Sequence, residues 1–245
     1  MAGRVYVVGI GPGNPPLRTF AAVEAIRKSS VVVGYETYIK LAGDLLEGKE
    51  VIPAKMRQEV FRAEAALKRA IQGEAVALIS DGDPQIYGMA PLLLELMAAR
   101  DVVVDVEVVP GVTAALAAGA RLGAPLGNDV AFINLSDLLT PREVILKRAV
   151  KAAEADFVIA LYNPIDPGLT EEVLRAIERI RGPEASVGVV KNAYRDGEEV
   201  RVLRLGEVRG DQLDMRTIAI IGNSETFTWR GMMITPRGYS RKYRL

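Results

Sequence analysis

The chain of 245 residues contains neither cysteine nor histidine. Without cysteine it can form no disulfide, no thiolate zinc site and no iron–sulfur cluster of its own, and it has no cysteine nucleophile. Without histidine it cannot build a catalytic triad with a histidine base. Any acid or base in a catalytic site must therefore be Asp, Glu, Lys, Tyr or the substrate itself.

Strong net charge and long apolar runs are also missing. The formal net charge is zero, which argues against a basic surface for nucleic acid, so we expect no nucleic-acid partner. No apolar run reaches the roughly 20 residues of a membrane helix, and the chain opens into a strand-like segment rather than a signal peptide. We therefore expect a cytoplasmic protein with no membrane partner. The pattern of residues also suggests no metal site.

What the sequence does contain is typical of an α/β protein. Hydrophobic residues make up 49% of the chain, enough for a full core, and the length allows one large α/β unit or two compact domains. In the first half, short β-branched runs alternate with longer amphipathic ones, a pattern that predicts a mostly parallel sheet with helices on its faces. The predicted strands are residues 4–8, 31–33, 75–79 and 102–109, and a helix is predicted over residues 57–72.

Turn residues between positions 121 and 129 interrupt the apolar pattern and predict two α/β domains, residues 1–122 and 123–245. In the second half, Thr140 to Glu143 reads as a capping box, with proline at the first helical position of a helix that ends near residue 154. A further helix is predicted over residues 170–181, and strands over 130–135, 157–161, 187–191, 200–205 and 217–221. The last strands have no long helices between them, which favours antiparallel hairpins and a mixed sheet.

Three glycine-containing turns each follow a predicted strand of the first half: Gly9 to Gly13, Ser80 to Pro84, and Pro110 to Ala114. The carboxyl ends of parallel strands are where α/β proteins bind ligands. Glycine lets backbone approach a ligand closely, and Thr113 is placed as a helix N-cap. Any one of these segments is also typical of an ordinary turn, but three at one sheet edge favour a binding cleft.

The first turn superficially matches the start of a dinucleotide-binding fingerprint. That pattern needs glycine at the position of Asn14, and Pro12, Pro15 and Pro16 do not suit the start of the helix that would receive a pyrophosphate. An oxidoreductase that uses a dinucleotide therefore remains only a disfavoured alternative.

Taken together, the motifs resemble the tetrapyrrole methylases, a family of methyltransferases that use S-adenosylmethionine. The resemblance is carried by residues 9–13 with Leu17 and Thr19, by Gly82-Asp-Pro84, and by residues 109–114. Longer segments are similar to members that methylate C17 of precorrin-3B: residues 34–38, 83–90, 135–141, 161–164, 221–224 and 235–239. The resemblance covers almost the whole chain. It implies two α/β domains of the tetrapyrrole methylase type with the active-site cleft between them, and a homodimer.

The resemblance also implies which residues bind the donor S-adenosylmethionine. These residues are Pro12, Gly82, Asp83, Ile86, Tyr87, Thr113, Ala114, Tyr162, Asn192, Ala193, Thr235 and Pro236. Two positions depart from the family pattern, because Asp81 stands where a small residue is expected and Gln85 where glycine is expected. The acidic and glycine positions most closely tied to binding are intact.

The activity implied is methylation at C17 of precorrin-3B, or of the cobalt-containing equivalent, with ring contraction, in cobalamin biosynthesis. Ring contraction requires a substrate hydroxyl to lose a proton, and Ser136 and Asp137 are the preferred polar residues near the reacting edge. The acetate and propionate groups of the substrate call for cationic and aromatic side chains. The candidates for binding the substrate are Gly11, Tyr35, Tyr38, Lys55, Arg57 and Arg237, with Lys191 and Arg195 as further cations.

Two other functions fit the same motifs. One is a corrin methylase that acts at another ring carbon. The other is a protein that binds S-adenosylmethionine without transferring the methyl group.

Overall fold

The structure is a computed structural model that describes residues 3–244. Contacts divide the chain into two compact units, Met1–Ala114 and Ala115–Leu245. The sequence places the boundary after residue 122, whereas this division falls after Ala114, the first residue of helix α5 (Ala114–Leu122). The helix groups with the second unit because its buried side chains pack there, with Leu122 directly against Gly188.

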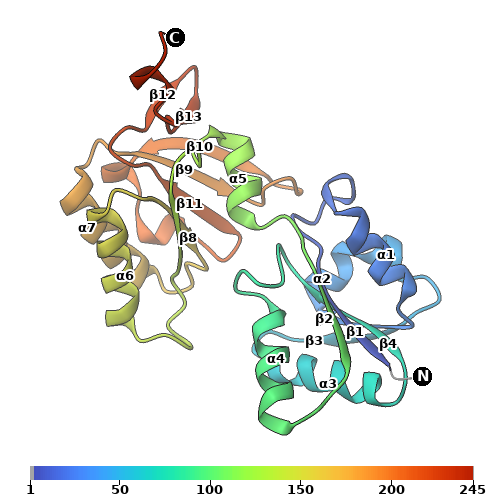
Figure 1. Ribbon diagram of the computed structural model, residues 1–245. Coiled ribbons are helices and arrows are strands. Elements are labelled where there is room, and N and C mark those ends of the chain that lie inside the picture. The colour runs from blue at the N-terminus through green and yellow to red at the C-terminus, as the bar shows by residue number, and fades with distance from the viewer. Residues whose placement is uncertain (1–2, 245) are drawn as a thin grey trace. The chain divides into compact units, whose positions relative to one another are not determined.

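The first unit is built on a parallel sheet of five strands in the order β3-β2-β4-β1-β5 (Figure 1). Every pair of neighbouring strands runs in parallel, which confirms the parallel sheet predicted from the alternating pattern. The strands are β1 (Arg4–Gly9), β2 (Val31–Tyr35), β3 (Glu50–Ala54), β4 (Ala75–Ser80) and β5 (Asp105–Val109).

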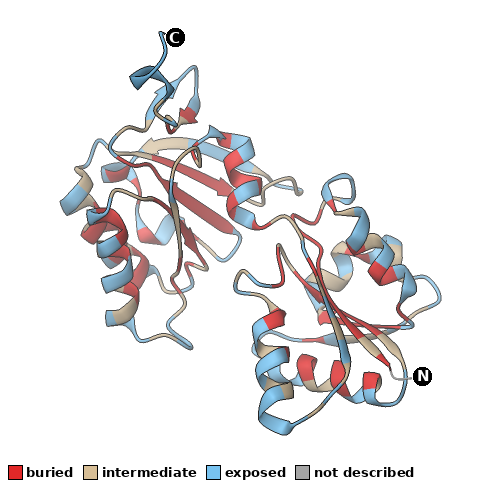
Figure 2. Cartoon of the chain, in the orientation of Figure 1, coloured by how far each residue is buried: buried red, intermediate tan, exposed pale blue. Residues whose placement is uncertain are grey.

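Two hydrophobic clusters, one on each face of this sheet, form the core of the first unit. Successive side chains of a strand point to opposite faces, so Val7 joins one cluster and Val8 the other. Helices α3 and α4 pack on the Val7 face, and helices α1 and α2 pack on the Val8 face. The central strands β2, β4 and β1 are thus buried on both sides, as their red colour in Figure 2 shows, whereas the edge strands β3 and β5 are partly exposed. The helices are α1 (Phe20–Lys28), α2 (Glu36–Leu41), α3 (Glu59–Ile71) and α4 (Met89–Arg100).

The second unit contains a mixed sheet of five strands in the order β10-β9-β11-β8-β7. Strands β7 and β8 are parallel, whereas β11 is antiparallel to both β8 and β9, and β10 is antiparallel to β9. This pairing confirms the mixed sheet predicted from the short connections. The strands are β7 (Val130–Asn134), β8 (Val158–Tyr162), β9 (Ser186–Lys191), β10 (Glu199–Arg204) and β11 (Thr217–Ile221).

Helices cover both faces of the second sheet. Helices α6 (Arg142–Glu154) and α7 (Pro167–Arg181) pack against the face that holds Val187 and Val189. Gly188 points to the other face, where α5 lies. A smaller sheet in the order β12-β13-β6 joins β12 (Phe227–Trp229) and β13 (Met232–Ile234) to β6 (Gly123–Ala124).

Three elements begin two or three residues away from their predicted starts. Helix α3 begins at Glu59 rather than residue 57, because Arg57 has a left-handed backbone with φ of 65°. Strand β5 begins at Asp105 rather than residue 102, because the chain leaves α4 through Asp101 and pairs with β1 only from Asp105. Helix α7 begins at Pro167 rather than residue 170, because the Asp166 side chain caps it.

The predicted capping box at the start of α6 is also wrong. The N-cap residue is Pro141 rather than Thr140, so the helix begins at Arg142. Proline has no side-chain oxygen that could accept from the first helical N–H groups. Across residues 3–244, no helix is both long and apolar enough to cross a membrane.

Candidate active site

The first unit places its glycine turns at a switch point of the parallel sheet. Strands β1 and β4 are neighbours, but the chain leaves β1 toward α1 on one face and leaves β4 toward α4 on the other. Where neighbouring connections diverge in this way, they leave a crevice at the carboxyl ends of the strands, and ligands of α/β proteins bind there. The loop after β5, on the other side of β1, joins the same edge.

The three loops at this edge are packed backbone against backbone. The Gly11 amide donates to the Gly82 carbonyl oxygen at 3.0 Å. A Cβ atom on Gly11 would lie 2.3 Å from the Gly82 Cα, and one on Gly111 would lie 2.2 Å from the Gly82 oxygen. These glycines are therefore required by contact between loops, a reason different from the ligand approach that the sequence suggests. Gly82 itself has a φ of +60°, which glycine adopts at little cost.

The Asp83 carboxylate ties two of these loops together. Its Oδ1 accepts from the Gln85 amide at 2.8 Å, and its Oδ2 accepts from the Gly111 amide at 3.2 Å. Asp83 is only 9% exposed, so both hydrogen bonds are largely protected from water. Gln85 is one of the two departures from the family pattern, and it contacts Asp83 through its backbone N–H rather than its side chain. The other departure, Asp81, accepts from the Gly82 amide at 2.8 Å.

The other donor-binding candidates of the first unit lie on the same loops. Pro12 and Thr113 are buried, Ile86 is half-buried and Ala114 is exposed. Tyr87 is 46% exposed and has a left-handed backbone with φ of 56°. A large side chain presented to solvent on such a backbone is consistent with a surface that contacts a ligand.

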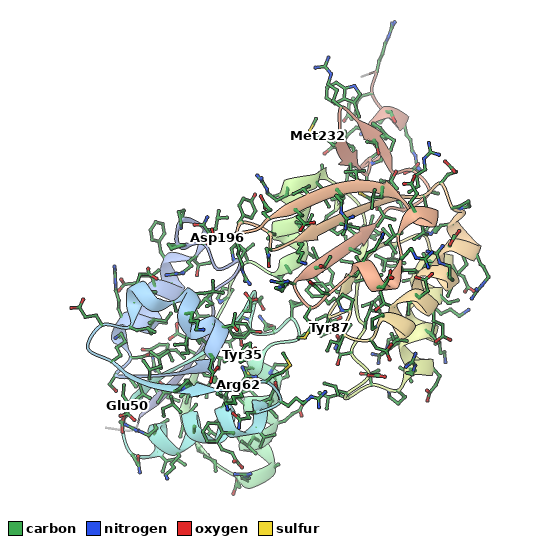
Figure 3. The ribbon with its side chains drawn as sticks, turned by 180° about the vertical axis from the view of Figure 1, so that it is seen from behind. Tyr35, Glu50, Arg62, Tyr87, Asp196 and Met232 are labelled. Atoms are coloured by element: carbon green, nitrogen blue, oxygen red, sulfur yellow. The ribbon has the colours of Figure 1, made fainter. Side chains whose placement is uncertain are left out.

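The substrate-binding candidates of the first unit follow the next strands of the same sheet. Tyr35 ends β2 and meets Tyr38 of α2 edge to face, with ring centroids 5.2 Å apart. Lys55 and Arg57 are exposed in the segment after β3. Figure 3 labels Tyr35 and Tyr87 on the side of this unit away from Glu50, where β3 begins. The structure thus brings the candidates of this unit to one edge.

The second unit gathers five of its candidates at one sheet edge. Because β11 is antiparallel to β8 and β9, strands β7, β8 and β9 all run in the same direction. Their carboxyl ends carry, in turn, Ser136 with Asp137, Tyr162, and Asn192 with Ala193. The Leu135 amide donates to the Tyr162 carbonyl oxygen at 2.8 Å, which holds the first two strand ends together.

Tyr162 is buried, and a helix holds its hydroxyl. The hydroxyl oxygen accepts from the Ala115 backbone amide at 3.0 Å, in the first turn of α5. Its ring lies 5.6 Å from that of Phe132, centroid to centroid. The side chain is thus fixed at both its ring and its polar end.

The proposed proton-transfer residues lie on a polar segment after β7. The Ser136 amide donates to the Asn134 side chain at 3.1 Å, and the same oxygen accepts from Asn163 at 3.0 Å. Asp137 is exposed and lies 3.7 Å from Arg142.

Lys191, one of the cations suggested for the substrate, is engaged by a residue that sequence reasoning missed. Its Nζ lies 2.8 Å from Asp214. Burial opposes ionisation of Asp214, but hydrogen bonds from Lys191, the Arg216 amide and Thr217 outweigh it and lower the pKa of Asp214 to about 2. Asp214 lies in the connection that leads into β11, and no local motif signals its role.

Thr235, which precedes Pro236 and Arg237 in the chain, has its contacts elsewhere in the second unit. The Thr235 hydroxyl lies 2.7 Å from that of Thr226, which in turn donates to the Asn223 side chain at 3.0 Å. Asn223 follows the end of β11, next to the start of β9, whereas Asn192 follows the end of β9. Thr235 therefore lies toward the other edge of the second sheet from Asn192, and the binding roles of Thr235, Pro236 and Arg237 stay predictions.

Comparison with known proteins places this geometry in a family. Residues 4–209 match the family model for tetrapyrrole (corrin/porphyrin) methylases. A protein of Archaeoglobus fulgidus named cobalamin biosynthesis protein CbiHC is 48% identical over 99% of this chain, and the chain spans about half, 54%, of that relative's length. A probable cobalt-factor III C(17)-methyltransferase of Salmonella typhimurium is 46% identical over 96% of this chain and 98% of its own length.

A solved structure agrees with these relatives. The crystal structure of the methyltransferase CobJ superposes with a TM-score of 0.90 at 34% identity, covering 96% of this chain and all of that one. The similarity therefore extends over both units and not only over the glycine turns of the first. The chain belongs to the tetrapyrrole (corrin/porphyrin) methylases.

Proposed function

We propose that the protein transfers a methyl group from S-adenosylmethionine to C17 of a precorrin macrocycle, precorrin-3B or its cobalt-containing equivalent, with ring contraction, in cobalamin biosynthesis. The observation that carries the proposal is that the first unit gathers its candidate residues at one edge of its sheet, and that the second unit gathers five of its candidates at one edge of its own sheet: Ser136, Asp137, Tyr162, Asn192 and Ala193. The full-length similarity to a C(17)-methyltransferase supports the choice of ring carbon. Any cobalt would belong to the substrate.

The loops of the first unit fit the donor chemically. A sulfonium and an α-amino group are both cationic, and this edge carries Asp81 and Asp83 and no histidine. Backbone carbonyl and amide groups of tightly packed glycine loops are fixed in place, which lowers the entropic cost of holding a small ligand. Pro12, Gly82, Asp83, Ile86, Tyr87, Thr113 and Ala114 would hold the donor from this unit, and Tyr162, Asn192 and Ala193 from the second.

S-adenosylmethionine supplies a methyl group already activated on a sulfonium. The residues of this chain then need only to orient the donor and the acceptor carbon and to exclude water. Tyr162, with its ring and hydroxyl both fixed, provides a rigid apolar wall for that purpose. Such a role suits a protein without cysteine or histidine nucleophiles.

Asp137 is the proposed base for the proton lost from the substrate hydroxyl, with Ser136 beside it. Removing a general base usually lowers turnover by about 10²- to 10⁴-fold. We therefore expect Asp137→Asn to lower kcat by about that factor while the affinity for S-adenosylhomocysteine stays unchanged. Full turnover in this variant would remove Asp137 as the base.

The substrate carboxylates would be bound by cations and tyrosines of the first unit, namely Lys55, Arg57, Tyr35 and Tyr38, with the Gly11 backbone as a further candidate. We also propose that the protein assembles as a homodimer. The small sheet of the second unit exposes Phe227, Trp229 and Met232, an apolar surface suited to a second copy. Light scattering after size exclusion would measure the mass directly, and a monomer would contradict this part of the proposal.

The first experiment is calorimetric titration with S-adenosylhomocysteine, with NADH as the control. We expect micromolar binding, about −8 kcal/mol, for S-adenosylhomocysteine alone. Absence of binding, both alone and with a tetrapyrrole present, would contradict the proposed donor, and binding of NADH would favour an oxidoreductase.

A second experiment distinguishes C17 methylation from the two other functions that fit the motifs. The protein is incubated with S-adenosylmethionine carrying a labelled methyl group and with precorrin-3B or its cobalt form, and the product is mapped by mass spectrometry and NMR. Label at C17 with ring contraction supports the proposal. Label at another ring carbon would indicate a sister methylase, and donor binding without transfer would indicate a non-catalytic protein.

A further inference from the structure

The connection from β9 to β10, residues 192–198, is held in an uncommon backbone conformation. Asn192 and Tyr194 have positive φ values of 49° and 60°, a region that residues other than glycine rarely occupy. Two such residues in one short connection persist only where surrounding contacts impose the conformation. Figure 3 labels Asp196 at the tip of this connection, well away from Met232 of the small sheet.

Glu198 provides the contact that holds this backbone. Its Oε1 accepts from the Tyr194 amide at 2.8 Å, one residue after Ala193. The same carboxylate accepts two hydrogen bonds from Arg121, from Nε at 2.9 Å and from a terminal nitrogen at 2.7 Å. A two-pronged pair of this kind fixes orientation as well as distance. The Glu198 side chain is 20% exposed, so the pair is partly shielded from solvent.

Arg121 connects this carboxylate to a rigid element. It lies in the last turn of α5, whose buried residues pack on the sheet. Its guanidinium also lies over the Tyr194 ring, 5.1 Å from the centroid, so it holds Tyr194 by the ring and, through Glu198, by the backbone. The other end of α5 holds the Tyr162 hydroxyl through the Ala115 amide. One helix therefore holds both segments of the second unit that are proposed to bind the donor.

We propose that Glu198 and Arg121 form a clamp that sets the backbone of Asn192 and Ala193 for S-adenosylmethionine. The inference rests on the proposed function, because it takes Asn192 and Ala193 as donor-binding residues. Glu198 and Arg121 are positioning residues, since they act through the Tyr194 backbone. The clamp should consequently control donor affinity and leave the chemical step unchanged.

The test compares donor affinity in Glu198→Gln and Glu198→Ala with that of the wild type. Gln keeps the shape and one acceptor oxygen but loses the charge, whereas Ala removes the contact entirely. We expect the Kd for S-adenosylhomocysteine, measured by calorimetry, to rise about tenfold for Gln and further for Ala. The KM for S-adenosylmethionine should rise by similar factors, while kcat and the KM for the tetrapyrrole stay unchanged.

Glu184→Gln is the matched control. It removes an ion pair with Arg204, 2.8 Å long, at the other end of β10, and it should change the Kd by less than about twofold. Arg121→Lys is the second variant, in case Glu198→Ala does not fold. Lysine keeps the positive charge but cannot donate the pair of hydrogen bonds that Arg121 makes to Glu198, so the Kd should still rise at least about threefold.

Three results would overturn the clamp: an unchanged Kd in Glu198→Gln, an unchanged Kd in Arg121→Lys, or a fall in kcat with no rise in KM for the donor. These results differ from failure of the proposed function, in which the wild-type protein itself would not bind S-adenosylhomocysteine.

Discussion

At the scale of single residues, the glycines of the first unit show that a motif can mark the correct loops although its glycines are needed for another reason than predicted. The sequence associates them with close approach of a ligand. In the structure, the space that a side chain would occupy at Gly11 and Gly111 is taken by the backbone of the Gly82 loop. The loops must pack in this way before any surface for a donor exists, so these glycines act on binding indirectly.

Replacing Gly111 by alanine adds one methyl group between these loops and tests whether they are packed backbone against backbone. In Gly111→Ala the new Cβ would lie 2.2 Å from the Gly82 oxygen and 2.7 Å from Gly9, both backbone atoms that cannot rotate away. Overpacking of this kind costs about 1–3 kcal/mol. We expect a loss of stability in that range in urea unfolding, and a loss of S-adenosylhomocysteine binding of tenfold or more.

Gly43→Ala is the control for this prediction. Among the residues that the structure describes, no atom beyond its chain neighbours lies within 4 Å of the Cβ position at Gly43. Stability and binding should stay close to those of the wild type. Equal behaviour of the two variants would show that the loops are not packed as described.

Asp214 carries a prediction about pH. Its folded pKa of about 2 lies below the ordinary value of 3.8, so the ionised carboxylate stabilises the fold above about pH 4, and this contribution is lost as the pH falls toward 2. Without screening, this lowering of the pKa would contribute about 2 kcal/mol to the free energy of unfolding. Because the Asp214 side chain is 43% exposed, solvent screening reduces the contribution to about 1 kcal/mol.

We therefore expect Asp214→Asn to lower the free energy of unfolding by about 1 kcal/mol at pH 7, and the difference from wild type to narrow between pH 4 and pH 2. Urea titrations at several pH values measure both quantities. Asp211→Asn, which affects a carboxylate that is 71% exposed and 3.9 Å from Arg209, should change little at any pH. A difference that persists unchanged to pH 2 would contradict the assigned role of Asp214.

At the scale of elements, two helices of the second unit begin in contrasting ways. Helix α7 is capped by Asp166, which accepts from the Gly168 and Leu169 amides at 2.7 and 3.0 Å. The Leu169 amide makes the largest contribution to lowering the pKa of Asp166. Helix α6 instead begins after Pro141, and its expected cap at Thr140 is not used.

This contrast predicts different costs for two similar substitutions. Asp166→Ala should destabilise the protein by about 1 kcal/mol, because it leaves two N–H groups of α7 without their acceptor. Thr140→Ala should stay within about 0.5 kcal/mol. Chemical unfolding of both variants at pH 7 measures the difference, and a larger cost for Thr140→Ala would show that the sequence-based cap was right.

These elements also show how far the sequence could predict the molecule. Strand positions and the parallel or mixed character of each sheet follow from local apolar pattern, which is why they were predictable. The start of α7 depends on a single side chain, Asp166, and the roles of Glu198 and Asp214 depend on contacts with distant segments. Contacts of that kind leave no periodic signal. For the same reason, motif matching alone could not show that Thr235 contacts Thr226, which follows β11.

At the scale of the whole molecule, each unit has its own hydrophobic core and its own edge of candidate residues. The proposed donor set draws on both units, so donor binding should leave a signature in each. Local amide hydrogen exchange reports such a signature, because backbone that contacts a ligand opens less often. Substitutions cannot give this information as directly, because they also change stability.

Hydrogen exchange with and without S-adenosylhomocysteine should therefore separate the two edges of the second sheet. We expect slower exchange at residues 9–13, 82–88 and 110–114 of the first unit, and at residues 160–163 and 190–195 of the second. Residues 222–226 and 235–238 should exchange as in the free protein, because Thr226 and Thr235 bond each other at the opposite edge. NADH, as the control, should slow exchange at none of these segments. Protection confined to the first unit would remove Tyr162, Asn192 and Ala193 from the donor set, and protection around Thr235 would return that residue to it.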